Sequence, residues 1–478
     1  MNQRVLPDSL EESLIADQLQ RQKAAFIAEG PVSAALREDR LQRAVDLLKT
    51  HADRICEVIS EDFGGRHPVT TLSMDVQTPI GHLKYAKKNV QRWMRPQRRA
   101  SVFPFNLFGA RAELRFQPKG VVGIAGTWNC PLFMLFGPLA GVFAAGNRAM
   151  LKPSDLSLAT SQWLAEVVPQ YFDPLELSVI TGGVATAQAF TRQAFDHLVF
   201  TGSINVAKQI MRDAAEHLVP LTLELGGKSP TVIGRSADLK KAAQSIVMAR
   251  IQNGGQVCVM PDTVYVPREH MAVFVAEFKA LWLQMLPTVT GNADMTAVAN
   301  ARHLERVERK IEQARAAGAL VEILGQVDAG GQDRRRPLRL VLDAPADTAF
   351  AQEEIFGQAM ALESYDDVQA VVARINAGSR PLALYYYGKD RAEQEYVLGH
   401  TLSGGACVNE AMLHVAVHDM PFGGIGASGM GRYNGPEGFA EFSHMRGVYH
   451  AGWWDPRRKL GMAPPYTDKL LQMMKKAL

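Results

Sequence analysis

Cysteine is scarce in this sequence, and its distribution excludes two common kinds of architecture. The chain has four cysteines in 478 residues, namely Cys56, Cys130, Cys258 and Cys407. They form no CxxC pair, and no combination of cysteine and histidine has the spacing of a metal site. We therefore expect neither a disulfide framework nor a metal centre. Without further context, each cysteine is most simply a small buried apolar residue.

A strong charge bias and a long apolar run are also missing. Lysine and arginine total 52 against 49 aspartates and glutamates, which leaves a net charge of +3. This bias is too small to indicate a nucleic-acid partner. No apolar run approaches the ~20 residues of a membrane span, and the opening MNQRVLPDSLEESL lacks the order of a signal peptide. We therefore expect a cytoplasmic protein with no nucleic-acid partner and no membrane span.

The composition that remains is typical of a folded chain with more than one domain. Hydrophobic residues make up 47% and charged residues 21%, both near the averages for globular proteins. The length is about three times that of a typical ~150-residue domain. Two or three domains are therefore expected.

Helical and strand-like patterns divide the chain. Apolar residues recur at helical spacing over 33–60 and 74–95, which predicts helices there. Runs typical of strands follow at 110–118, 120–126, 148–153, 176–181, 196–203, 231–234, 262–267, 339–343, 382–388 and 405–410. The segments between these runs can hold helices, so the fold class is α/β with parallel sheets and right-handed crossovers. Ligands of such sheets bind beyond the carboxyl ends of the strands.

Two short segments carry residues suited to catalysis. The segment LELGGKSP at 223–230 places Glu224 before two glycines, where partial burial can raise the pKa of the carboxyl group into the range of a general base. The segment NGGQVC at 253–258 places Cys258 after paired glycines, which let the backbone bend tightly. Taken separately, a strand-end glutamate held by backbone amides and a buried structural cysteine are the simpler interpretations.

Taken together, these segments resemble the signature of the aldehyde dehydrogenase superfamily. The interval between Glu224 and Cys258 is 34 residues (258 − 224), which matches the usual interval of the family. Further matching segments, in the order of the family, are TWNCP at 127–131, LKPSD at 151–155, FTGS at 200–203, EEIFG at 353–357 and PFGGIGASGMG at 421–431. The short region before RFQPKGVVGI, the segment GFAEFSH and the late APPY are similar to the class 3 group, and most closely to the bacterial coniferyl aldehyde dehydrogenases.

The resemblance implies the aldehyde dehydrogenase fold, with a Rossmann-like cofactor domain, an α/β catalytic domain and a small bridging region. Residues 1–95 and 116–225 would form the NAD(P)-binding domain, and residues 226–410 the catalytic domain. The bridging, oligomerisation region would comprise residues 96–115 and 411–478. The active site would lie between the first two domains. A homodimer is also implied, in which the bridging strand of one subunit extends the sheet of the other.

The resemblance assigns the chemistry to three residues. Cys258 would be the nucleophile, whose thiolate attacks the aldehyde carbon, and a positive or basic neighbour would lower the pKa of its thiol. Asn129 would donate its side-chain amide to the oxyanion, together with the backbone N–H of Cys258; an asparagine in a turn before Pro131 is the alternative. Glu224 would activate the water that hydrolyses the thioester, which favours the acid as product.

The resemblance also implies a nicotinamide cofactor, NAD or NADP, with NAD favoured. Lys152 would bind the adenosine ribose hydroxyls, and Asp155 stands where relatives have glutamate. The shorter Asp155 side chain leaves the choice between the two cofactors open. Gly202 and Ser203 would begin the helix whose N-terminus faces the pyrophosphate.

On the nicotinamide side, Glu354 would hold the ribose and Phe356 would pack near the ring. Three nearby positions depart from the pattern of the family. Ala207 replaces a glycine of the cofactor helix, and Cys130 replaces an aromatic residue beside Asn129. Gln358 replaces the proline usual after EEIFG, which is expected to loosen the nicotinamide loop.

The favoured substrates are hydrophobic aldehydes, including aromatic ones of the coniferyl type. His414 stands where class 3 relatives often carry histidine and is a candidate for the substrate pocket; a packed histidine is the alternative. Rival functions remain open: formation of an acyl-coenzyme A, a non-catalytic binding role on the same fold, and a cysteine hydrolase of esters.

Overall fold

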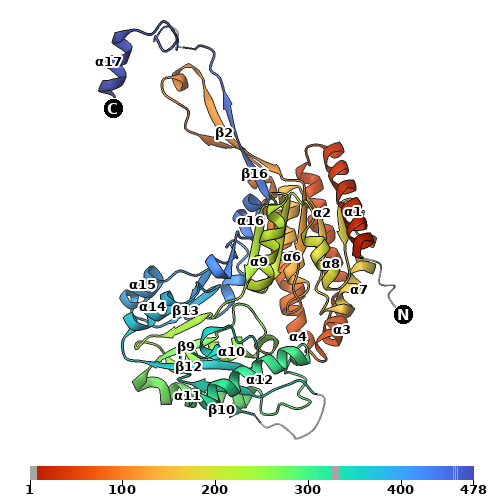
Figure 1. The fold of residues 1–478 in the computed structure, drawn as a ribbon, viewed down its shortest axis with the longest axis vertical. Helices are drawn as coiled ribbons and strands as arrows, with labels where there is room; N and C mark the ends of the chain where they lie inside the picture. Colours follow the sequence, from red (N-terminus) through yellow and green to blue (C-terminus); the bar gives the residue numbers. More distant parts are fainter. Residues whose placement is uncertain (1–7, 326–332, 456, 458, 460) are drawn as a thin grey trace.

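The computed structural model describes residues 8–325, 333–455, 457, 459 and 461–478. In this part of the chain, three β-sheets are connected by helices. Figure 1 shows the N-terminal helices and the first sheet at one end of the body, the second sheet at the other end, and a long arm that leads away to the C-terminus.

The first sheet has the strand order β15-β7-β6-β3-β4-β5. Its strands are β3 (Val121–Ala125), β4 (Arg148–Lys152), β5 (Leu177–Val179), β6 (His197–Gly202), β7 (Leu221–Leu225) and β15 (Gly429–Met430). All pairs are parallel except that of β15 with β7. The helices that connect the parallel strands are α6 (Phe133–Ala145), α7 (Leu158–Val167), α8 (Val184–Thr191) and α9 (Ile204–Ala215), with a 3₁₀ turn at Val168–Gln170. Strands β3 and β4 are wholly buried, because a parallel sheet is covered on both faces.

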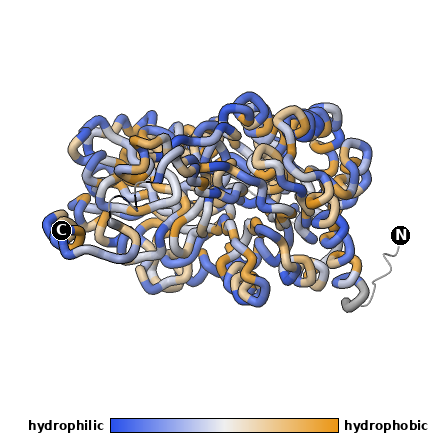
Figure 2. Tube along the Cα trace, turned by 90° about the horizontal axis from the view of Figure 1, so that it is seen from above, coloured by the Kyte–Doolittle hydropathy of each residue, from blue (hydrophilic) through white to orange (hydrophobic). Residues whose placement is uncertain are grey.

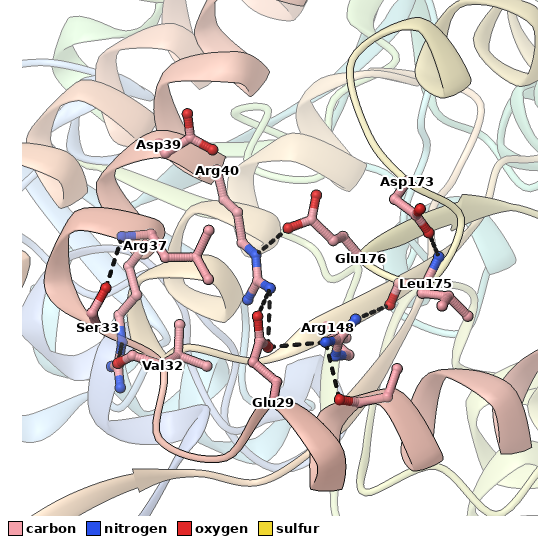
Figure 3. A network of polar contacts seen from close by, with 12 residues as sticks. Glu29, Val32, Ser33, Arg37, Asp39, Arg40, Arg148, Asp173, Leu175 and Glu176 are labelled. Atoms are coloured by element: carbon pink, nitrogen blue, oxygen red, sulfur yellow. Dashed lines mark hydrogen bonds and ion pairs between the residues drawn. The ribbon is translucent and has the colours of Figure 1, made fainter.

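Helices from the N-terminal part of the chain pack beside this sheet (Figure 1). They are α1 (Asp8–Glu29), α2 (Ala34–Thr50), α3 (Ala52–Phe63), α4 (Pro68–Thr71) and α5 (Thr78–Trp93), with a π-helical segment at Leu72–Gln77. Figure 3 shows the ionic network that holds them: buried Arg40 donates to Glu29 at 3.0 Å and to Glu176 at 2.9 Å, and Arg148 donates to Glu29 at 2.9 Å. Removing one partner would leave a buried charge uncompensated, so the network fixes α1 and α2 against β4 and β5.

The second sheet has the strand order β10-β11-β12-β9-β8-β13-β14 and is parallel except for the pair of β10 and β11. Its strands are β8 (Pro230–Ile233), β9 (Thr263–Pro267), β10 (Leu320–Leu324), β11 (Leu338–Leu342), β12 (Ala359–Tyr365), β13 (Ala383–Tyr387) and β14 (Gly405–Val408). The helices and turns of this region are α10 (Leu239–Ile251), 3₁₀ turns at Gln252–Gly255 and Arg268–His270, α11 (Met271–Met285), α12 (Ala301–Ala316), α13 (Ala349–Gln352), α14 (Val368–Ala377) and α15 (Arg391–His400).

The third sheet forms the base of the arm. It joins β1 (Gln97–Arg99), β2 (Arg111–Pro118) and β16 (Ser443–His450) in antiparallel pairs. Helix α16 (Gly435–Glu441) packs against α6 beside it, and α17 (Asp468–Lys476) stands at the far end of the arm (Figure 1). Further 3₁₀ turns lie at Phe105–Phe108, Leu413–Ala416 and Gly426–Ser428. Seen from above, Figure 2 places the C-terminus at one side of the molecule, away from the N-terminal helices.

The strand predictions are confirmed, because each predicted run contains a strand of the structure. The prediction of one helix over 33–60 is wrong: His51 leaves the helical conformation with φ −104° and ψ 19°, and the chain forms α2 and α3. Strands β1, β10, β12, β15 and β16 were not predicted. No helix among the described residues is long and apolar enough to cross a membrane.

Candidate active site

A left-handed turn positions the segment that carries Cys258. After α10, the residues Asn253, Gly254 and Gly255 have φ of 49°, 61° and 75°. A Cβ atom at Gly255 would lie 2.4 Å from the carbonyl oxygen of Gly357. Glycine is required there because the conformation is left-handed and the backbones are in contact. The turn therefore holds the segment that carries Cys258 directly against the chain that enters β12.

A buried arginine reinforces this contact. Arg250 donates hydrogen bonds to the carbonyls of Gly357 and Ala359, the second at 2.7 Å, and to the carbonyl of Pro261 at 3.3 Å. Burial lowers the pKa of Arg250 to about 10, so the guanidinium remains charged near neutral pH. Hydrogen bonds from a charged donor are stronger than neutral ones, so Arg250 joins Pro261, after Cys258, to the chain that enters β12.

Glu224 and Cys258 are in contact, and burial changes the acidity of both. Glu224 lies on β7 with 1% of its surface exposed, and its carboxylate is hydrogen-bonded to the Cys258 thiol. Burial raises the pKa of Glu224 to about 7. Burial and the neighbouring Glu224 raise the pKa of the Cys258 thiol well above its usual range. The expectation of a lowered thiol pKa is therefore wrong for the protein alone, and the thiol depends on the adjacent base.

Asn129 lies on a turn that is bonded to the catalytic segment. Its Nδ2 donates to the carbonyl of Gln256 at 3.1 Å. In return, Nδ2 of Asn253 donates to the backbone carbonyl of Asn129 at 2.9 Å. An amide nitrogen carries two hydrogens, so Asn129 can still donate one to an oxygen that develops on a carbon attached to Cys258.

A buried ion pair that the sequence analysis missed supports this turn. Arg66 and Asp75 have fully buried side chains and interact at 2.9 Å. Asp75 also accepts hydrogen bonds from the backbone N–H groups of Leu132 and Phe133, at 3.0 and 3.1 Å, and Arg66 donates to the carbonyl of Asn129 at 3.4 Å. The pair caps α6 and holds the Asn129 turn. No spacing rule marks it, because the two residues are joined only by the fold.

Glu354, on the chain before β12, lies close enough to Glu224 and Cys258 for the charges to interact. A Cβ atom at Gly226 would lie 2.1 Å from Oε2 of Glu354, so only glycine leaves room for this carboxylate. Burial and Asp262 raise the pKa of Glu354 to about 8, and its Oε1 is buried without a partner among the described residues. Phe356 follows with φ 51°, and its ring meets Trp128 edge-on at 5.5 Å.

The other predicted binding residues lie at the carboxyl ends of β4 and β6, which flank β3. Lys152 is 3% exposed, and its Nζ donates to the carbonyls of Pro153 and Gly182 at 2.9 Å each. Asp155 is exposed nearby. Gly202 ends β6, and Ser203 caps α9 by accepting a hydrogen bond from the N–H of Val206. Apart from that of Val206, the first N–H groups of this 12-residue helix have no partner within the helix.

The departures from the expected pattern fit into the packing. Ala207 is buried against Leu223 and Leu225, so its methyl group fills the space between α9 and β7. Gln358 is 2% exposed at the start of β12. Among the described residues, no group of three or more histidine, cysteine, aspartate or glutamate side chains is placed to hold a metal ion.

His414 lies near the segment that carries Cys258. It is 8% exposed, and its Nδ1 lies 3.2 Å from Sγ of Cys407. Its ring is 6.1 Å from that of Tyr385, whose hydroxyl donates to the carbonyl of Val259, next to Cys258. A contact between His414 and substrate stays a prediction.

Comparison with known proteins gives consistent matches over nearly the whole chain. The sequence matches the aldehyde dehydrogenase family over residues 10–448. It is 45% identical over 470 residues to a probable coniferyl aldehyde dehydrogenase of Caulobacter vibrioides, which covers 97% of this chain and 96% of that protein. It is 42% identical over 433 residues to a coniferyl aldehyde dehydrogenase of a Pseudomonas species, which covers 90% and 89%.

The structural comparison points the same way. The fold is similar to the crystal structure of a Mycobacterium tuberculosis aldehyde dehydrogenase complexed with NAD+, with a TM-score of 0.83 and 27% sequence identity. The similarity covers 93% of this chain and 91% of that one.

Proposed function

The chain belongs to the aldehyde dehydrogenase family, and we propose a catalytic mechanism and a substrate class for it. It has the fold of that family and is an enzyme that oxidises aldehydes. In our proposal, Cys258 and Glu224 convert a hydrophobic or aromatic aldehyde to the carboxylic acid. The contact between the Cys258 thiol and the Glu224 carboxylate is the observation that carries the proposal.

The first half of the reaction forms a thioester on Cys258. Glu224 accepts the proton of the thiol, and the thiolate forms a bond to the aldehyde carbon. The electrons of the carbonyl π bond move to the oxygen, which Asn129 and the backbone N–H of Cys258 stabilise. When this oxyanion reforms the carbonyl, a hydride leaves the carbon. A nicotinamide cofactor, when bound, supplies the acceptor for that hydride.

The second half releases the acid. Glu224 takes a proton from water as the water oxygen attacks the thioester carbon, and the C–S bond then breaks to regenerate Cys258. Before this step, Glu224 must lose the proton it took from the thiol. Its pKa of about 7 makes that loss possible near neutral pH.

The residues present fit a nicotinamide dinucleotide. Buried Lys152 has a third N–H beyond its two backbone contacts, which suits a ribose hydroxyl, and Asp155 lies beside it. The N-terminus of α9, from Gly202 and Ser203, suits the pyrophosphate. The unpartnered Oε1 of Glu354 suits the second ribose. Phe356 lies at the edge of that pocket, where a nicotinamide ring would pack.

We favour NAD over NADP as the cofactor. The exposed carboxylate of Asp155 would repel a 2′-phosphate near Lys152. The similar Mycobacterium tuberculosis enzyme was crystallised with NAD+. Both arguments favour the cofactor that lacks the additional phosphate.

The proposed substrates follow from the wall of the pocket and from the relatives. Cys130, Phe133 and Met134 form a buried apolar cluster, with Met74 and Val415 packed against it. This wall suits a hydrophobic or aromatic side chain better than a charged one. Two relatives named for coniferyl aldehyde cover most of the chain, so we propose aromatic aldehydes of that type.

The same reasoning extends to organisation and location. We propose an NAD(P)-binding domain at residues 1–95 and 116–225, a catalytic domain at 226–410 and a bridging region at 96–115 and 411–478. The third sheet would extend a sheet of a second subunit and form a homodimer; Phe103 and Trp453 on the arm are strongly exposed. A cytoplasmic location is proposed because the cysteines of the described chain are unpaired.

The decisive experiment measures reduction of the cofactor by purified protein with aliphatic and aromatic aldehydes, using NAD+ and NADP+ separately. Cys258→Ala should lower turnover by at least about 10⁴-fold, because the nucleophile is removed. Cys56→Ala, at a buried cysteine of α3, is the matched control and should retain turnover. Turnover without Cys258 would overturn the mechanism. Stimulation by coenzyme A would favour acyl transfer, and ester hydrolysis without cofactor as the main activity would favour a hydrolase.

A further inference from the structure

A buried histidine with a ring nitrogen free to accept a hydrogen bond lies beside the proposed substrate side. His82 of α5 is 3% exposed; one ring nitrogen faces the backbone carbonyl of Val415, and the other has no partner among the described residues. Burial and the neighbouring His418 lower the pKa of His82 to about 3, although the Val415 backbone opposes the shift. The ring is therefore neutral near pH 7 and has one donor and one acceptor nitrogen. Buried polar groups of native proteins are bonded to a neighbour, to water or to a ligand.

Contacts through a group of apolar residues connect His82 to Cys258. We call this group the apolar collar; it comprises Cys130, Phe133, Met134, Met74 and Val415. Cys130 is close enough to Cys258 to raise the pKa of its thiol. At the other side of the collar, the ring of Phe133 stacks on that of His82 at 5.8 Å, with an interplanar angle of 26°. The apolar collar thus lies between the Cys258 thiol and the His82 ring.

A second imidazole lies next to His82 and nearer to solvent. The ring of half-buried His418 meets that of His82 edge-on at 4.9 Å. A Cβ atom at Gly81 would lie 2.1 Å from Nε2 of His418, so the glycine gives this ring its place on α5. The hydroxyl of Tyr85 is hydrogen-bonded to Asp419, which holds the loop of His418 against the same helix.

The rim around the imidazole pair is apolar. Leu413, Val417 and Met420 lie on the loop of His418, and all are exposed. From this exposed loop inward, contacts lead from His418 to His82, then to Phe133 of the apolar collar, and through Cys130 to Cys258. This sequence of surfaces matches an aldehyde with an apolar middle and a hydrogen-bonding group at the end remote from the carbonyl.

We propose that His82, with His418 beside it, binds a hydroxyl group at the far end of a ring-containing aldehyde and selects such aldehydes over unsubstituted ones. The proposal rests on the proposed function, because it places the formyl group at Cys258 and the ring in the apolar collar. The acceptor nitrogen of His82 receives the hydrogen of the hydroxyl. His82 is thus a specificity-determining residue that takes no part in the bond changes at Cys258.

The test compares 4-hydroxycinnamaldehyde with cinnamaldehyde, which differ only in the ring hydroxyl. We expect the protein to favour the hydroxylated aldehyde in kcat/KM. His82→Phe keeps an aromatic ring against Phe133 and removes the acceptor. It should lower the ratio of the two kcat/KM values about 10- to 100-fold, mainly through a higher KM for the hydroxylated aldehyde. His82→Gln, which offers an acceptor again, should restore part of the ratio.

A second variant tests the geometry without removing an imidazole. Gly81→Ala should displace the ring of His418 and lower the same ratio by a smaller factor, because His82 itself is kept. Helix α5 tolerates alanine well, so the variant should fold. His217→Phe, at an exposed histidine after α9, is the matched control and should leave both KM values unchanged.

The outcomes separate this proposal from the proposed function. An unchanged ratio in His82→Phe overturns the role of His82. If that variant does not fold, an unchanged ratio in both Gly81→Ala and His418→Phe overturns it. Absence of Cys258-dependent cofactor reduction with every aldehyde would instead contradict the proposed function. Loss of the ratio in His82→Phe and its partial recovery in His82→Gln support the proposal.

Discussion

The proposed cofactor side and the proposed substrate side of the site are built in different ways. On the cofactor side, Lys152, Gly202 and Ser203 stand at the ends of parallel strands, so their position follows from the alternation of strands and helices. On the substrate side, His82 and Val415 come from segments more than 300 positions apart in the sequence. They meet only because α5, α6 and the loop before β15 pack together. Strand ends can be located from the sequence, whereas the wall of the substrate pocket depends on tertiary structure.

After the loss of Cys258, the largest effect should come from Glu224, the residue at which both sides meet. Glu224→Gln removes the base but keeps the size of the side chain. Steady turnover should fall about 10³-fold, equivalent to about 4 kcal/mol of activation free energy, because the thioester is no longer hydrolysed. Because Glu224 also takes the proton of the Cys258 thiol, the burst of reduced nicotinamide should slow as well, but it should keep its stoichiometric amplitude as long as hydrolysis is the slower step. Rapid-mixing absorbance measures both phases; unchanged steady turnover would show that Glu224 is not the deacylating base.

The same carboxyl group predicts the pH dependence of turnover. The pKa of Glu224 is raised to about 7, so below this pH the group is protonated and cannot accept a proton. Steady turnover should therefore rise as the pH increases through about 7. In Glu224→Gln this rise should disappear from the residual steady rate. A rise that persists unchanged in the variant would assign it to another group, with the Cys258 thiol as the first alternative.

The next largest effect should come from breaking the buried ion pair of Arg66 and Asp75, which supports the turn of Asn129. Asp75→Asn places an amide where a carboxylate receives hydrogen bonds from Arg66, Leu132 and Phe133. We expect a loss of about 3 kcal/mol in the free energy of unfolding, because the Arg66 charge remains buried without its partner. Denaturant titration measures this loss. A smaller kcat should accompany it, since Arg66 also contacts the turn of Asn129.

An exposed ion pair provides the control for this variant. Glu57 and Arg54 interact on the surface of α3 at 2.7 Å. Glu57→Gln should leave the denaturation midpoint unchanged, because exposed pairs contribute little to stability. Equal midpoints for Asp75→Asn and the unmodified protein would mean that the buried pair does not hold the substrate side.

The difference between strand ends and tertiary packing also explains how much of the fold and of the site could be predicted from the sequence. Strands β3, β4 and β6 were predicted because short apolar runs end in polar residues, and the residues at their ends were placed correctly at the sheet edge. Glu224 and Cys258 were predicted through family motifs. The structure adds their contact and the raised pKa of each, which no local pattern contains. Arg66, Asp75 and His82 could not be predicted, since a single charged residue or histidine outside a motif has no distinguishing spacing.

The smallest effect should test how finely the cofactor side discriminates. Asp155 is exposed beside the end of β4, and its negative charge should repel a 2′-phosphate near Lys152. Asp155→Asn removes the charge and keeps the shape. The KM for NADP+ should fall about tenfold, equivalent to about 1.4 kcal/mol, while the KM for NAD+ changes less. Asp173→Asn, at an exposed aspartate before β5 and thus at the opposite edge of the sheet, is the matched control. If the KM for NADP+ stays unchanged in Asp155→Asn, the cofactor preference must depend on the fit of the backbone around Lys152 rather than on this charge. The cofactor side would then also depend on tertiary packing, which a strand-end motif does not encode.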